Sequence, residues 1–400
     1  MILGQIEKTE ERKIKLINFI SFLNGFSQAV VVYVLSTFFE KSSGMVNIGI
    51  FYTVAYLFVL LIFLNLHKTV RRLGKSNVFF FTILMKILAI GLLIFSGAEK
   101  ISIIWGVIYL IAAAIEWTML DVILESFSQD QVSGRIRGLH LTVFNAGFLF
   151  GPFLSAKILE KFDFYGIFTL AFILASIIFV VALVGLRKVN HQFSQRLSVP
   201  NLIKKIWKRK NIIRIYWISF VLEAFFALMV IYVPIYLIDV MRFSWEDIGK
   251  IFTIMLIPFV ILQYPMGVLA DKKFGEKEFL IFSIILMGLA TLAVYFIYSQ
   301  SLWVWALILF MTRVGAALIE VLRDSYFYKQ ISGYDVDIIN FFRTAMPMGY
   351  IFSTAVSALI LIFFPVKGAF ILVAILIFSA LYPAWKLVDN PCEEELENKL

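Results

Sequence analysis

Long uncharged apolar runs alternate with short polar connections along the chain. A run of about 20 apolar residues is the length that an α-helix needs to cross the hydrocarbon core of a bilayer. The runs lack the strict alternation of a membrane β-barrel. The pattern therefore predicts an all-α integral membrane protein with twelve transmembrane helices, at 15–39, 46–66, 77–97, 102–124, 138–159, 165–186, 212–238, 247–270, 279–299, 302–322, 338–364 and 367–387.

The composition excludes several soluble classes. Hydrophobic residues make up 61% and charged residues 16% of the 400 residues, against about 45–50% and about 25% in globular domains. So few charges cannot cover a soluble surface, which argues against a cytosolic enzyme or a disordered chain. The single cysteine, Cys392, excludes intramolecular disulfides and CxxC motifs. With three scattered histidines, we expect no metal and no cofactor.

The positive charges give the orientation. With the N-terminus inside, 27 of the 36 Lys and Arg residues fall in cytoplasmic segments and 7 on the opposite side. Positive loops stay cytoplasmic, so both termini are expected there, in a multi-pass protein of the cell membrane. Because the basic residues lie in short connections and form no face on a folded domain, the net charge of +9 does not indicate nucleic-acid binding.

One long connection divides the predicted helices into two sets of six. We expect an N-terminal bundle at 1–186, a basic linker at 187–211, a C-terminal bundle at 212–388 and an acidic tail at 389–400. A charged helix on the cytoplasmic leaflet is the simplest interpretation of the linker, and binding of a regulatory partner is the alternative.

Weak internal similarity indicates that the two halves are repeats. The matches lie at a nearly constant offset of about 200 residues, which favours a duplicated architecture with a central cavity. They are Ile48-Gly49 with Ile248-Gly249, Tyr33 with Tyr232, Gly74 with Gly275, and 113–116 with 317–320.

The connection after the eighth predicted helix carries a recognisable motif. Residues 267–277 read Gly-Val-Leu-Ala-Asp-Lys-Lys-Phe-Gly-Glu-Lys. This resembles the loop signature of the major facilitator superfamily, in which Gly267 allows close helix packing, Gly275 allows the turn, and Asp271, followed by Lys272, pairs with a cation. The corresponding N-terminal stretch, 66–75, has Val70 where the acid would fall.

The fifth predicted helix carries a second motif, Gly138, Gly147 and Gly151-Pro152. It resembles the helix 5 motif of antiporters in this superfamily, where small residues allow close packing against the other half and Pro152 bends the helix. Helix packing without bearing on transport is the alternative. The fourth helix has Glu116 and lacks the arginine of the drug antiporters.

The resemblance implies two six-helix bundles that alternate access to a midplane site, lined by the first, fourth, seventh and tenth helices. We expect a monomeric secondary active transporter of a small solute, coupled to protons. The rivals are a passive facilitator of the same fold, a non-transporting membrane receptor and a membrane-embedded enzyme, for which we find no catalytic cluster. Organic cations, amphipathic drugs, sugars and amino acids are all compatible substrates.

Four ionisable residues lie deep in predicted helices, where charge is costly and usually functional. They are Lys86, Glu116, Glu223 and Arg313. We expect one pair per half, Lys86 with Glu116 and Glu223 with Arg313, with the two carboxylates carrying protons. Static ion pairing is the alternative.

Other polar and aromatic residues complete the candidate site. Those expected to line the substrate cavity are Asn24, Gln28, Trp117, Asn145, Phe226, Gln263, Tyr264 and Asn340. Those expected to form cytoplasmic gate salt bridges are Asp121, Glu125, Arg135, Arg137, Glu320, Arg323, Asp324 and Arg343, with Asp271 pairing to Arg135 or Arg137.

Overall fold

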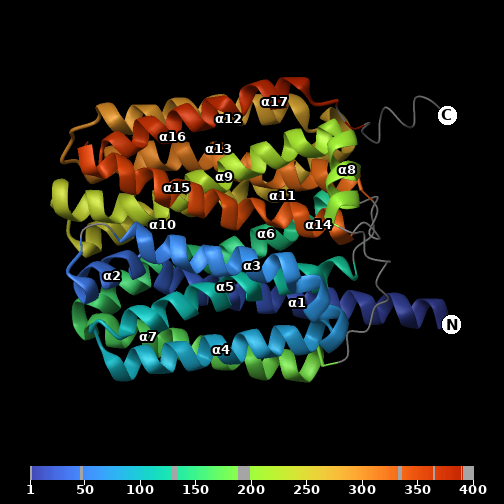
Figure 1. Cartoon of the computed structure of the whole chain (residues 1–400), viewed down its shortest axis with the longest axis horizontal. Helices are drawn as coiled ribbons and strands as arrows, with labels where there is room; N and C mark the ends of the chain where they lie inside the picture. The colour runs from blue at the N-terminus through green and yellow to red at the C-terminus, as the bar shows by residue number, and fades with distance from the viewer. Residues whose placement is uncertain are drawn as a thin grey trace.

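The computed structural model describes residues 2–45, 48–127, 133–187, 199–331, 336–363, 365–388 and 390. Within these ranges all regular elements are α-helices or short π-helical turns, and most run along one long axis (Figure 1). The N-terminal elements are α1 (Ile2–Val32), α2 (Leu35–Ser43), α3 (Gly49–Leu73), α4 (Lys75–Ser96), α5 (Ser102–Glu125), α6 (Ser133–Leu149) and α7 (Gly151–Gly185).

The C-terminal elements continue the same design after a short connecting helix. They are α8 (Val199–Lys208), α9 (Lys210–Ile235), η2 (Tyr236–Val240), α10 (Trp245–Ile261), α11 (Gln263–Leu269), η3 (Ala270–Phe274), α12 (Lys277–Phe296), α13 (Leu302–Lys329), α14 (Val336–Arg343), α15 (Ala345–Phe363), α16 (Gly368–Ser379) and α17 (Leu381–Lys386).

Ten segments of the described chain are long and apolar enough to cross a bilayer. One of them, Gly138–Gly185, has 48 residues and contains two predicted crossings. Asp163 interrupts it with a φ of 51° between those two. The predicted crossing at 338–364 falls on α14 and α15. The all-helical architecture is therefore present, and the number of twelve crossings stays a prediction.

Proline explains several helix breaks that apolar runs alone do not predict. Pro258 lacks the N–H that would continue the ladder, and α10 ends one turn later. Pro234 similarly precedes the π-helical turn at the end of α9. Pro347 stands in the first turn of α15, a position where proline is tolerated, so a new helix begins beside it.

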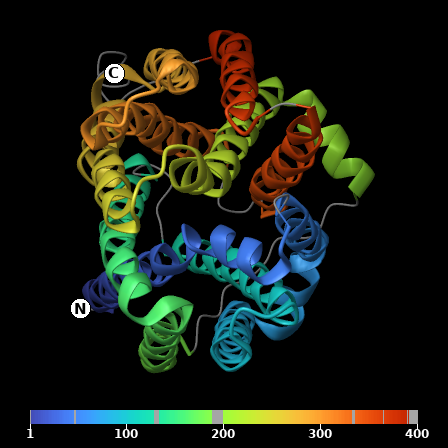
Figure 2. The ribbon, with the colours of Figure 1, turned by 90° about the vertical axis from the view of Figure 1, so that its left-hand side faces the viewer.

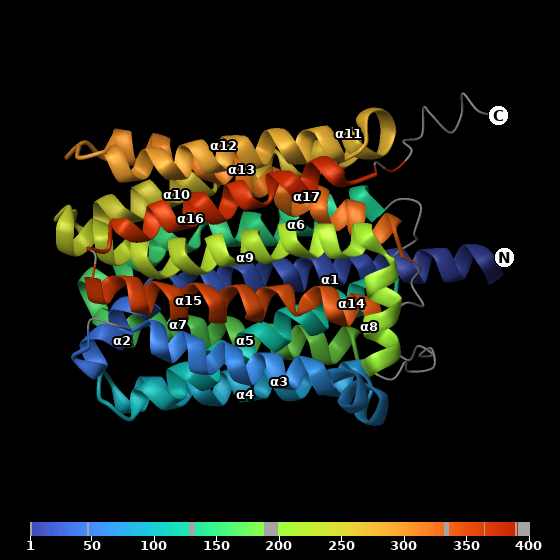
Figure 3. The same ribbon diagram turned by 45° about the horizontal axis from the view of Figure 1, so that its top comes forward.

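The two halves lie side by side when the molecule is viewed along its long axis (Figure 2). Elements α1–α7 occupy one side and α9–α17 the other. The start of α1 and the end of α17 lie at the same end of the molecule, which we call the terminal end (Figure 1). Helix α8 crosses this end at a steep angle to the bundle (Figure 3). It exposes Trp207 and buries Ile206, as expected for an amphipathic linker helix.

The glycines of the helix 5 motif allow close backbone packing, mostly within the N-terminal half. Gly147 lies against the carbonyl of Phe22 in α1, and Gly151 lies against Ala29. Gly138 lies against the backbone of Gln263 in the other half. The expected packing between halves therefore involves Gly138, whereas Gly147 and Gly151 join α6 and α7 to α1. Pro152 begins α7, so the chain breaks at this point.

Candidate functional site

A cavity of about 230 Å³ lies between the two halves. Its walls come from α1, α5, α9 and α13, the four helices expected from the family resemblance, and also from α2, α3, α6, α10, α14 and α15. Of the residues expected to line a substrate cavity, four do so: Gln28, Trp117, Asn145 and Phe226. The structure thus places the candidate site where both halves contribute side chains.

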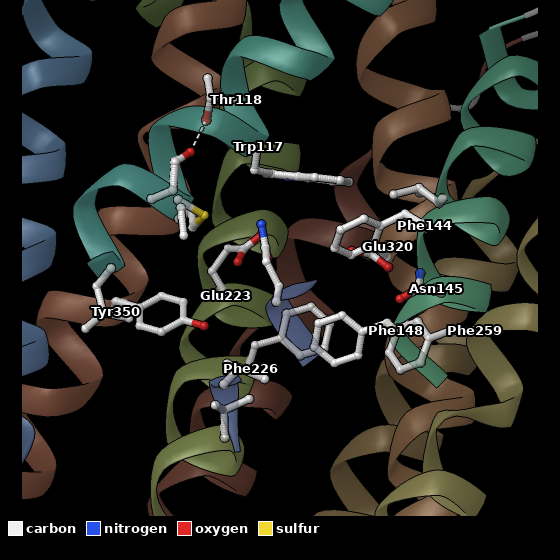
Figure 4. Close-up of a pocket in the computed structure, with 18 of the residues that line it drawn as sticks. Trp117, Thr118, Phe144, Asn145, Phe148, Glu223, Phe226, Phe259, Glu320 and Tyr350 are labelled. Carbon is white, nitrogen blue, oxygen red and sulfur yellow. Dashed lines mark hydrogen bonds between the residues drawn. The ribbon is translucent and has the colours of Figure 1, made fainter. Parts of the chain in front are cut away.

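Aromatic rings form much of the cavity wall (Figure 4). The ring centroids of Trp117 and Phe144 are 4.2 Å apart, and those of Phe226 and Phe259 are 6.1 Å apart. Phe144 and Phe148 lie one turn apart on α6, and their ring centroids are 5.8 Å apart. All three pairs are tilted and none is a face-to-face sandwich, the arrangement that aromatic rings avoid. The wall therefore suits an apolar or aromatic part of a solute.

Glu223 on α9 lines the cavity and binds Arg323 of α13. Arg323 Nη2 lies 2.9 Å from Glu223 Oε1, and its Nη1 donates to Ser219 Oγ at 2.7 Å. Ser219 and Glu223 are four residues apart and share one helix face, so a single guanidinium reaches both. Arg323 also lies 3.4 Å from Asp324 Oδ1. This arrangement corrects the expected pair of Glu223 with Arg313.

Arg313 lies at a different level of α13, against phenylalanine rings of α9. Its guanidinium carbon is 4.9 Å from the centroid of Phe225 and 5.9 Å from that of Phe226. The hydroxyl of Tyr33 interacts with it from the N-terminal half. Arg313 is 2% exposed and lines the cavity. Because α9 presents rings here and no carboxylate, the expected acid partner is missing.

Lys86 and Glu116 form the ion pair expected in the N-terminal half. Lys86 Nζ lies 2.6 Å from Glu116 Oε2 and donates to Asn24 Oδ1 at 3.2 Å. Gln28 in turn donates to Asn24 at 3.4 Å. Both charged side chains are fully buried and neither lines the cavity. Asn24 and Gln28 therefore connect this pair to the cavity wall.

A chain of side-chain hydrogen bonds joins the two halves beside the cavity. Asn145 Nδ2 donates to Gln263 Oε1 at 3.0 Å, and Gln263 Nε2 donates to Glu320 Oε2 at 2.6 Å. Glu320, expected in a gate salt bridge, instead lines the cavity and ends this chain. The other four expected cavity residues are not among the lining residues: Asn24, Gln263, Tyr264 and Asn340.

The halves also touch on either side of the cavity. Toward the terminal end, Arg343 of α14 forms an ion pair with Asp121 of α5. Toward the opposite end, the Thr53 and Thr354 hydroxyls are 2.7 Å apart. One turn closer to the cavity, Tyr56 stacks on Tyr350 with centroids 3.9 Å apart. Contacts between the halves thus lie at both ends of the cavity, between α5 and α14 at one end and between α3 and α15 at the other.

The loop motif lies at the terminal end and forms an ionic cluster within its own half. Lys329 Nζ lies 2.9 Å from Asp271 Oδ1 and 2.7 Å from Glu276 Oε1. Asn390 also donates to Glu276, at 3.1 Å. Burial raises the pKa of Glu276, and the Lys329 charge opposes that shift. Gly275 turns with a φ of 68°, as the motif implies, while Gly267 is buried and Lys272 exposed.

The remaining gate residues lie outside the described side chains. Arg135, Arg137 and Glu125 belong to this group. The start of α6, which carries Arg135 and Arg137, lies beside α11, since Gly138 packs against the backbone of Gln263. The pairing of Asp271 with Arg135 or Arg137 stays a prediction.

Sequence reasoning missed the tyrosines of the cavity. Tyr33, Tyr56, Tyr109 and Tyr350 all line it. Among so many aromatic residues, composition does not distinguish a cavity ring from a core or lipid-facing one. The spacing of Phe144 and Phe148, four apart on the face that also carries Asn145, is a signal that would have found part of the wall.

Comparisons with known proteins agree with this architecture. The sequence matches the family model of the Major Facilitator Superfamily over residues 17–251 and 246–399. The structure is similar to that of the human organic anion transporter MFSD10 (TETRAN), with a TM-score of 0.72 and 14% identity, over 94% of this chain and 99% of that chain. It is also similar to FucP, a Major Facilitator Superfamily transporter in the outward conformation, with a TM-score of 0.68 and 13% identity, over 94% and 99% of the two chains. A comparison with curated protein sequences gives no match. The chain therefore belongs to the Major Facilitator Superfamily and is a multi-pass membrane transporter rather than an enzyme.

Proposed function

We propose that this protein is a secondary active transporter that moves a small solute across the cytoplasmic membrane by alternating access. The observation that carries this proposal is the charged, aromatic cavity between the halves, with contacts between the halves at both of its ends. Opening one set of contacts while the other stays closed would expose the cavity to one side at a time. Parallel six-helix repeats around a central site are an established transporter design.

The terminal end is proposed to face the cytoplasm. The excess of Lys and Arg in the segments of this end supports that orientation, and so does the exposed basic face of α8. Lys204 and Lys208 of this helix are both exposed. Basic side chains at this place suit an anionic leaflet.

Glu223 is the proposed proton-coupling residue, in preference to Glu116. Glu223 lines the cavity, and Arg323, its cation, is shared with Ser219 and Asp324. A movement of α13 against α9 would change the distance between this acid and its cation. A carboxylate that loses a nearby cation in a dry site takes up a proton more readily. Glu116 is fully buried against Lys86, away from the cavity, which suits a static pair better.

Transport into proteoliposomes, measured against a solute panel with and without a pH gradient, tests this function. The wild type is expected to accumulate its substrate only when the gradient is applied. Glu223→Gln is expected to abolish accumulation and to retain counterflow exchange, because a neutral side chain cannot carry the proton. The exposed Glu278 gives a control, Glu278→Gln, with unchanged accumulation.

Two outcomes would contradict the proposal. Equilibration without accumulation under any gradient would favour the passive facilitator. Full pH-driven accumulation by Glu223→Gln would exclude proton carriage at this residue.

A further inference from the structure

The cavity contains a cation whose charge is not neutralised by the described part of the protein. Three arginines line the cavity, and two of them have acid partners: Arg323 binds Glu223, and Arg343 binds Asp121. Arg313 forms no ion pair with any carboxylate in the described ranges, and its Nη1 has no hydrogen-bond partner there. It nevertheless lies at the middle of α13 and is 2% exposed.

The surroundings of Arg313 support the cation without cancelling its charge. The faces of Phe225 and Phe226 attract a guanidinium through their ring quadrupoles, and the Tyr33 hydroxyl adds a polar contact. None of these groups carries a negative charge. A buried cation is normally paired, since its desolvation is costly. The missing countercharge is therefore expected to come from a molecule that enters the cavity.

The chemistry of the site selects one class of countercharge. A guanidinium presents a planar fork of donors that matches the two oxygens of a carboxylate. Phe226, which contacts Arg313, is also in contact with Phe259 across the cavity wall, with centroids 6.1 Å apart. A carboxylate at Arg313 would place the rest of its molecule against these rings.

We propose that Arg313 is the binding residue for the carboxylate of a small organic anion whose apolar or aromatic body lies against Phe226 and Phe259. This inference rests on the proposed transport function and names the substrate class of the same cavity. Glu223 binds Arg323, and Glu320 accepts a hydrogen bond from Gln263, so neither of these cavity acids is bonded to the Arg313 guanidinium.

Binding to the purified full-length protein in detergent tests the proposal with three probes that share one phenylalkyl body and differ in the charge of the end group. These are 4-phenylbutyrate, its neutral amide 4-phenylbutyramide and the cation 4-phenylbutylamine. Thermal unfolding is followed as each probe is titrated. The carboxylate is expected to raise the midpoint of the wild type, and the amide and the amine to leave it unchanged.

Three variants separate ligand binding from a structural role. Arg313→Met is expected to bind 4-phenylbutyrate at least tenfold more weakly, and Arg313→Lys to bind it with intermediate affinity, because the charge remains without the fork. Arg214→Met removes an arginine at the start of α9, outside the cavity, and is expected to bind like the wild type. Without ligand, Arg313→Met is expected to unfold at the same temperature as the wild type or higher, because it removes a buried unpaired charge.

Several results would overturn the inference. They are equal stabilisation of the wild type by the amine or the amide, equal stabilisation of Arg313→Met by the carboxylate, and a lower unliganded midpoint of Arg313→Met that Arg313→Lys restores. The last would show that Arg313 stabilises the fold. If the wild type accumulates sugars or organic cations in proteoliposomes and does not bind the carboxylate, this inference fails while the proposed function stands.

Discussion

Individual buried charges in this protein differ by what surrounds them. Lys86 has a carboxylate at 2.6 Å and an amide oxygen at 3.2 Å, whereas Arg313 has aromatic rings and a tyrosine hydroxyl. A fully satisfied pair is stable as a unit, and the loss of one member leaves an uncompensated charge. Replacement by Met is therefore expected to lower the stability of the protein at Lys86 and to leave it unchanged or raise it at Arg313.

Lys86→Met is expected to destabilise the protein by about 3–5 kcal/mol, since Glu116 loses its partner in a fully buried site. The double variant Lys86→Met with Glu116→Leu is expected to recover most of that loss, because it removes both charges and keeps apolar volume. Thermal unfolding in detergent provides the measurement. A double variant as unstable as the single one would show that the ion pair stabilises the fold by more than the neutralisation of its two charges.

At the scale of helices, the apolar runs predicted where the helices lie along the sequence, but they did not predict which side chains meet between helices. Each predicted crossing is mostly helix in the described chain, because length and hydrophobicity are local properties of a sequence. The partner of Glu223 depends on the relative level of α9 and α13, which no local pattern contains. Ser219, one turn before Glu223, gives Arg323 a second hydrogen-bond partner on α9. The sequence also missed Tyr56 and Tyr350, which meet only when α3 packs on α15.

Close packing of α6 against α1 gives a prediction at this scale. A side chain at Gly147 would overlap the carbonyl of Phe22, so Gly147→Ala is expected to cost about 1–3 kcal/mol of stability, the usual range for overpacking. Gly91→Ala in α4 is the matched control, because a methyl group there meets Phe172 at an ordinary 3.6 Å. It is expected to be neutral or slightly stabilising, since alanine favours helix. Equal effects of the two substitutions on thermal unfolding would refute the packing role.

For the whole molecule, the proposed alternating access requires the halves to separate at one end of the cavity in each cycle, and contacts between the halves lie at both ends. The Thr53 and Thr354 hydroxyls are 2.7 Å apart, so a disulfide between these two positions would hold α3 and α15 together. Thr53→Cys with Thr354→Cys, in a Cys392→Ser background, is expected to lose at least 90% of uptake when oxidised and to regain it on reduction. Each single cysteine variant controls for the substitutions themselves. Continued uptake by the fully cross-linked protein would exclude separation of α3 from α15 as part of the cycle.

The hydrogen-bond chain from Asn145 through Gln263 to Glu320 has a direction. Each amide nitrogen donates toward the C-terminal half, and the chain ends on a carboxylate, which accepts strongly only while it is ionised. A proton on the accepting oxygen of Glu320 would turn an acceptor into a donor facing a donor. The hydrogen bond between Gln263 of α11 and Glu320 of α13 would then weaken. Because the same Gln263 side chain accepts from Asn145 of the other half, the charge of Glu320 and the contact between the halves would be linked through one residue.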